Sequence, residues 1–208
     1  MSTREVRSID ARGSGRERAG IVVIALLVVG AVGFYVALRS GRGGDAPSSN
    51  LLPYQTLVRS LPAADQQMYT DIRRGLPALE DERARTTRWP EPVLLEANSV
   101  PPFAGARAAG VEWQKFQRGV TVNYLGLPSD PSMPAWLLAV QEPEPNSPPD
   151  PAPLDDEHHR LPDGTTLHIY VWMHRYGGRV AAAFNAQPQN DGWTEVFGAP
   201  PNPVIPAR

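Results

Sequence analysis

Apolar residues recur along this chain with two different periods, and each period predicts one type of element. Between Leu57 and Leu79, leucine, isoleucine and methionine return every three, four or seven positions, which predicts amphipathic helices with one apolar stripe. Gly75 and Pro77 fall inside this region and predict a break between two helices, because proline disrupts a helix interior. Beyond residue 110, apolar and polar residues alternate, which predicts strands in 111–119, 120–128, 135–143, 167–174, 179–186 and 192–198.

Helices followed by a run of antiparallel strands are typical of an α+β fold, in which amphipathic helices pack on one face of an antiparallel sheet. The composition of the remaining segments then divides the chain. We expect an arginine-rich tail (1–18), a transmembrane helix (19–38), a flexible tether (39–50), an α+β domain (51–198) with a proline-rich loop (142–153), and a C-terminal tail (199–208).

One segment is apolar enough to cross a membrane. Residues 19–38 carry no charge, and their length matches the ~20 residues that a helix needs to span a bilayer core. A cleaved signal peptide is the alternative, but its apolar region has only ~7–15 residues. Arginines are more numerous before this segment than just after it, so the positive-inside rule places the N-terminus in the cytoplasm. The sequence therefore predicts a single-pass inner-membrane protein whose domain lies in the bacterial periplasm.

Composition excludes several classes of function. The chain has no cysteine, which rules out disulfides and thiolate metal ligands. Its formal net charge is -2, so no overall positive field attracts nucleic acid. The sequence contains no nucleophile elbow, phosphate-binding loop, zinc-protease helix or dinucleotide fingerprint. We therefore expect a protein that is not an enzyme.

The four histidines all lie in one stretch, DDEHHRLPDGTTLHIYVWMH. Its Leu-Pro-Asp-Gly-Thr sequence is typical of a three-residue hairpin loop, in which His158 faces His168. Facing residues have Cβ atoms ~4.5–5.5 Å apart, so two imidazoles there can share one ion. Asp156 is expected on the same face, as a third ligand. A two-residue loop would bring His159 opposite His168 instead. The candidate ion is zinc or another divalent transition metal, although a hairpin with two opposed histidines needs no metal.

The strand after this turn separates its side chains between two faces. Leucine, isoleucine, valine and methionine alternate along one face, which predicts the core side. Tyr170, Trp172 and His174 point to the other face, together with His168. His174 is ~20 Å from His168 along the strand, too far to share its ion. If this second face is exposed, its aromatic side chains form a docking surface for another protein.

The stretch EHHRLPDGTTLHIYVWMH, the single N-terminal span and the stretch LVRSLPAADQQMYTDIRRGLPALEDER together resemble a family of uncharacterised bacterial membrane-anchored proteins. That family is encoded beside genes for zinc-type metal ABC transporters. The resemblance implies an accessory role in metal uptake or handling, with a metal ABC transporter or another envelope protein as partner. The alternative from a different class is a scaffold without metal, pilin-like or transporter-associated, that docks through the aromatic face.

Overall fold

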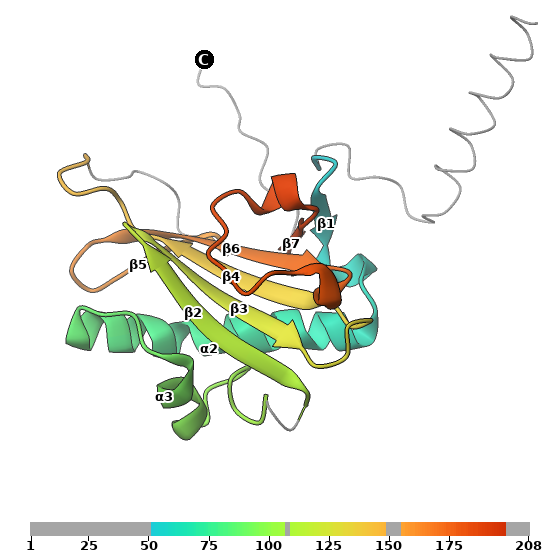
Figure 1. Cartoon of the computed structure of the whole chain (residues 1–208). Helices are drawn as coiled ribbons and strands as arrows, with labels where there is room; N and C mark the ends of the chain where they lie inside the picture. The colour runs from blue at the N-terminus through green and yellow to red at the C-terminus, as the bar shows by residue number, and fades with distance from the viewer. Residues whose placement is uncertain (1–50, 107–108, 149–154, 199–208) are drawn as a thin grey trace, which may run out of the picture. The chain divides into compact units, whose positions relative to one another are not determined.

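The computed structural model describes residues 51–106, 109–148 and 155–198 (Figure 1). The predicted arginine-rich tail, transmembrane helix, tether and C-terminal tail lie outside these residues, as does part of the proline-rich loop. Among the residues that are described, no helix combines the length and the apolar character needed to cross a bilayer.

The described chain is a mixed α+β structure, as the sequence predicts. Its helical elements are η1 (Val58–Ser60), α2 (Ala63–Thr86), α3 (Pro92–Ala97), η2 (Gly177–Arg179) and η3 (Pro188–Asp191). Its strands are β1 (Gln55–Leu57), β2 (Val111–Arg118), β3 (Thr121–Pro128), β4 (Ala135–Gln141), β5 (His158–Arg160), β6 (Thr166–His174) and β7 (Thr194–Phe197).

The seven strands form one sheet in the order β1-β7-β6-β4-β3-β2, and β5 pairs with β6 off this path. The pairings among β2, β3, β4, β5, β6 and β7 are antiparallel. β1 departs from the predicted antiparallel sheet, because it pairs with β7 in parallel. The described chain therefore begins and ends at the same edge of the sheet, whereas β2 lies at the opposite edge.

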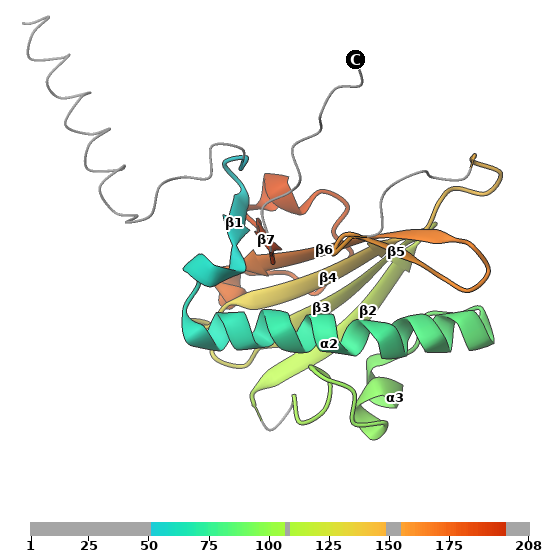
Figure 2. The ribbon, with the colours of Figure 1, turned by 180° about the vertical axis from the view of Figure 1, so that it is seen from behind.

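One long helix, α2, crosses one face of the sheet (Figure 2). The predicted break at Gly75 and Pro77 is wrong, because α2 continues through both residues. Proline costs a helix interior ~3 kcal/mol. Leu76 and Leu79 flank Pro77 and are 1% and 0% exposed, and burying each such side chain contributes ~1.5–3 kcal/mol. Packing on the sheet therefore outweighs the local cost of the proline.

The core on this face alternates along each strand as a pleated sheet requires. Leu167, Ile169, Val171 and Met173 of β6 point toward α2, which confirms the predicted core side of that strand. The other main contributors are Ile72, Leu76, Leu79, Val122, Tyr124, Trp136, Leu138, Val140 and Leu161.

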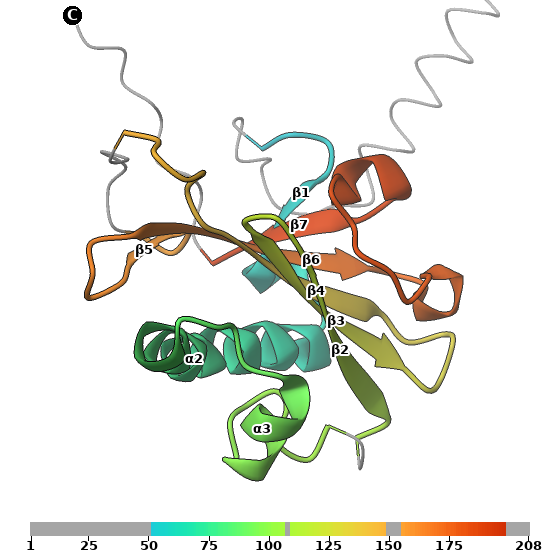
Figure 3. The same ribbon diagram turned by 60° about the vertical axis from the view of Figure 1, so that its left-hand side comes forward.

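The opposite face of the sheet is covered by the segment that carries η2 and η3 (Figure 3). The predicted strand at 179–186 is wrong, because this segment contains only η2 and irregular chain. Both edges of β6 are already occupied, by β4 on one side and by β5 and β7 on the other. Gly177 also packs closely against Pro128, where an added Cβ would be 2.3 Å from the proline ring. After β6 the chain therefore turns over the face of the sheet and does not form a further strand at its edge.

Candidate functional site

The histidine hairpin has the predicted three-residue loop. Leu161 N donates to Thr165 O at 2.9 Å, and Gly164 has a φ of 91°, which favours glycine. The resulting register places His158 opposite His168 and His159 opposite Leu167. The alternative two-residue loop is thereby excluded.

The two opposed histidines are in direct contact. The ring centroids of His158 and His168 are 4.9 Å apart, with an angle of 80° between the ring planes. Both side chains are only partly exposed. The structure therefore brings together two imidazoles from neighbouring strands, as the sequence predicts.

Asp155 fixes the orientation of the His158 ring. Its Oδ1 lies 2.8 Å from His158 Nδ1 and also accepts the backbone N–H groups of Glu157 and His158, at 2.8 and 2.9 Å. Burial raises the pKa of Asp155, but these hydrogen bonds outweigh it and leave the pKa below its ordinary value. The ionised carboxylate only accepts, so Nδ1 carries the hydrogen and the lone pair of neutral His158 lies on Nε2.

The structure does not bring Asp156 to this pair. Asp156 Oδ1 lies 3.6 Å from Arg73 Nη2, on the side of α2. Within the residues that the structure describes, no group of three or more histidine, aspartate or glutamate side chains is arranged to hold a metal ion. The carboxylate beside the pair is Asp155, and the Asp-x-x-His spacing is the signal for it that the sequence contained.

His159 joins the hairpin to α2. Its Nδ1 lies 2.5 Å from Glu80 Oε1 and its Nε2 lies 3.3 Å from Arg73 Nη2. Arginine only donates, so Nε2 accepts and Nδ1 donates to the glutamate. Both ring nitrogens of His159 are engaged in these contacts, and its side chain therefore links β5 to α2.

Two carboxylates in this part of the sheet, the buried Glu195 of β7 and the half-buried Glu157 directly before His158, have raised pKa values. Burial raises the pKa of Glu195, which is 6% exposed and accepts a hydrogen bond from Gln55 Nε2 at 2.9 Å. Burial also raises the pKa of Glu157, and the charges of Glu195 and Asp155 raise it further. Asp155 and Glu157 both interact electrostatically with His158, which makes its surroundings favourable for a cation.

The aromatic side of β6 is not an open surface. Trp172 is 7% exposed and stacks on Tyr54, with ring centroids 6.1 Å apart. His174 contacts the edge of Trp193, and its Nδ1 lies 2.9 Å from Tyr176 O. The condition for a docking surface is therefore not met at Trp172, while Tyr170 and His174 remain partly exposed.

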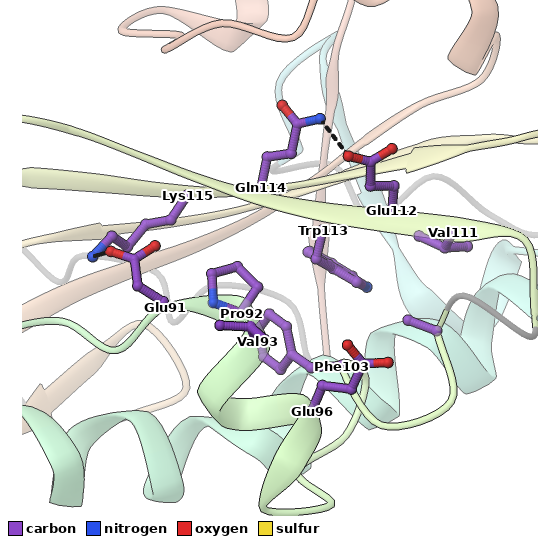
Figure 4. A pocket seen from close by; sticks show the side chains of 11 residues that line it. Glu91, Pro92, Val93, Glu96, Phe103, Val111, Glu112, Trp113, Gln114 and Lys115 are labelled. Atoms are coloured by element: carbon purple, nitrogen blue, oxygen red, sulfur yellow. Dashed lines mark hydrogen bonds and ion pairs between the residues drawn. The ribbon is translucent and has the colours of Figure 1, made fainter.

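A cleft of about 280 Å³ lies between α3 and β2 (Figure 4). Glu91, Glu96 and Glu112 line it, and Lys115 forms an ion pair with Glu91. The indole Nε1–H of Trp113 is buried there and has no hydrogen-bond partner within the described part of the chain. The full lining is Glu91, Pro92, Val93, Glu96, Phe103, Ala106, Val111, Glu112, Trp113, Gln114 and Lys115.

The fold and the site define an α+β domain with a pair of opposed imidazoles at a hairpin. A model of a family of unknown function (DUF6162) matches residues 55–199. The match covers more than half of the chain, and the protein therefore belongs to this family. No curated protein and no solved structure shows significant similarity to the chain.

Proposed function

We propose that this protein is a membrane-anchored periplasmic accessory in metal handling, which binds a divalent transition metal of the zinc type through His158 and His168. The observation that carries the proposal is the contact between these two rings, with Asp155 holding one of them. The predicted span at residues 19–38 supplies the anchor, and the resemblance to proteins encoded beside metal transporter genes supports the role.

The separation of the rings fits a shared ion. Zinc binds imidazole nitrogen at ~2.0–2.1 Å in tetrahedral geometry, which places the centroids of two bound rings roughly 5 Å apart. The observed distance between the centroids of His158 and His168 is 4.9 Å. The separation of the two rings is therefore compatible with one ion bound by a nitrogen of each.

Asp155 adds the support that metal-binding histidines usually have. A ligating histidine commonly donates its other N–H to a carboxylate, which fixes the ring and raises the basicity of the ligating nitrogen. Asp155 has this relation to His158, with 2.8 Å between Oδ1 and Nδ1. His158 is therefore prepared to bind a cation through Nε2.

Two histidines fill only part of the coordination shell of zinc. Structural zinc sites have four protein ligands, and catalytic sites have three with one open position. A two-histidine site takes its remaining ligands from water or from a docked protein. Such a site suits the transfer of an ion to or from a partner, such as a metal ABC transporter, better than catalysis or permanent storage.

A scaffold without metal is the alternative function. It relies on the face formed by Tyr170, Trp172 and His174. The burial of Trp172 removes the largest of these side chains from the accessible surface, which weakens this alternative.

The proposal is tested by calorimetric titration of the tag-free full chain in detergent with zinc, at pH 7.5 and pH 5.5. We expect binding at pH 7.5 that weakens strongly at pH 5.5, where protons compete for imidazole. The variant His158→Ala/His168→Ala should lose binding, and His174→Ala, from the same strand, should keep it. Binding that survives in the double variant, or no binding at pH 7.5, would exclude the proposed site.

A further inference from the structure

Among the residues that the structure describes, no strand pairs with the outer edge of β2 between residues 113 and 117. β2 is the last strand at its end of the sheet (Figure 1). At its start, Ser129 N donates to Gly110 O and Val111 N donates to Ala106 O. Val111 is opposite Pro128, so the bond from Ser129 N to Gly110 O joins the neighbouring pair of facing residues. The pair of Val111 and Pro128 is therefore a non-hydrogen-bonded pair.

This assignment fixes the direction of every later backbone group of β2, since hydrogen-bonded and non-hydrogen-bonded pairs alternate. Glu112, Gln114, Phe116 and Arg118 exchange hydrogen bonds with β3. The N–H and C=O groups of the intervening residues 113, 115 and 117 point away from the sheet. On the other side of β3, Glu142 N donates to Val120 O. The backbone groups of residue 120 therefore point toward β4 and those of residue 121 toward β2, which agrees with the assignment for β2.

We propose that this edge pairs with the same edge of a second copy of the chain, antiparallel and centred on Lys115. In this register Lys115 faces Lys115 of the second copy, and Trp113 faces Gln117. All three outward residues then exchange hydrogen bonds. A shift of one residue places each outward residue opposite one whose backbone groups point away, and a shift of two residues leaves one of the three without an outward partner from the same set.

The charges along β2 favour this register. Glu112 and Arg118 are both exposed. In the register centred on Lys115, Glu112 of each copy lies directly opposite Arg118 of the other copy, which gives two pairs of opposite charge. Opposite charges in facing positions stabilise a strand pair, and like charges destabilise it. The charge of each facing lysine is already balanced by an ion pair with Glu91, and its Nζ also donates to Trp89 O at 2.8 Å.

Apolar side chains beside the edge support the same partner. Val93 and Leu94 of α3 are 65% and 40% exposed. Val93 lines the cleft beside β2, and Leu94 lines the neighbouring cleft with Lys115 and Gln117. A second copy seated on β2 brings its own α3 to the same side of the joined sheet, where these side chains can be buried.

The buried Trp113 gives a further reason. Its Nε1–H lacks a hydrogen-bond partner among the described residues, and such a buried donor costs ~1–3 kcal/mol. In the proposed register Gln117 of the second copy lies opposite Trp113 and carries an amide oxygen that can accept this hydrogen.

Cysteine cross-linking tests the register directly, because the chain has no cysteine of its own. The variant Glu112→Cys/Arg118→Cys places two thiols in facing, non-hydrogen-bonded positions of the two copies, within the Cα distance that a disulfide spans. Oxidation of the full chain in detergent should give a covalent dimer. Each single variant is the matched control, because its two thiols then lie ~20 Å apart along the strands. Absence of the dimer, or equal yields from the single variants, would overturn the proposal.

Charge reversal gives a second measurement without any covalent bond. Glu112→Arg and Arg118→Glu should each lower the dimer fraction seen by analytical ultracentrifugation at low salt, and the double reversal should restore it. An unchanged dimer fraction in both single variants, or a double variant as weak as the singles, would show that β2 does not pair in this register.

Discussion

Replacing Gly75 by alanine should destabilise the protein, although alanine is the better helix former. Gly75 lies inside α2, where the change to alanine gains ~1 kcal/mol of helix propensity. A Cβ at this position would be 1.9 Å from Pro101 O and 3.1 Å from Pro101 C. Ordinary contacts between carbon and carbonyl oxygen are ~3.3 Å or longer, so the helix and the loop must separate by about 1.4 Å.

The loop cannot retreat freely, because it is anchored in the core. Phe103 follows Pro101 in the loop, is 2% exposed, and contacts Trp113 and Tyr124 with ring centroids 5.1 and 5.7 Å away. Overpacking of such a core typically costs ~1–3 kcal/mol. A backbone shift of this size belongs at the upper end of that range, so after the gain in propensity we expect a net loss of about 2 kcal/mol.

The assay is thermal and urea unfolding of the full chain in detergent, followed by tryptophan fluorescence. A loss of 2 kcal/mol corresponds to a fall in Tm of roughly 4–8 °C for a domain of this size. Thr70→Ala, on an exposed position of the same helix, is the control and should be neutral or slightly stabilising. A Gly75→Ala variant as stable as the wild type would refute the close approach of α2 to the loop.

Three further substitutions and one control substitution test the electrostatics. Asp155→Asn should weaken zinc binding by about 10–100-fold, because it removes the carboxylate behind His158, whereas Asp156→Asn should leave the calorimetric titration unchanged. The side-chain hydrogen bonds from Arg83 lower the pKa of Glu142 from its ordinary 4.5. The ionised Glu142 therefore stabilises the folded state at neutral pH, and this contribution is lost as the pH falls through the lowered pKa. Glu142→Gln should therefore cost about 1–3 kcal/mol at pH 7 and much less at pH 3 in urea denaturation; an equal cost at both values would contradict the pairing. Burial raises the pKa of Glu195, so its ionised form destabilises the fold at neutral pH, and that cost is relieved as the pH falls. Glu195→Gln should raise the free energy of unfolding at pH 7 by about 1 kcal/mol, with a smaller gain near pH 4; a loss of stability at pH 7 would contradict this.

The sequence by itself determined the loop type and the strand register of the histidine hairpin. Loop chemistry and alternation act between residues a few positions apart, and they are enough to pair His158 with His168 and to place Leu161 with the core side of β6. The hairpin of β2 and β3 and the α+β class follow from the same short-range patterns.

Contacts between distant segments were decided only by the tertiary structure. α2 continues through Pro77 because the sheet buries leucines on both sides of it, which no local signal reveals. The segment 179–186 forms no strand, since β4, β5 and β7 already occupy both edges of β6. Asp156 and His159 turn toward α2 because Arg73 and Glu80 lie there. Local patterns therefore fixed which two histidines meet, whereas the packing of the helix on the sheet selected which neighbouring groups could join them.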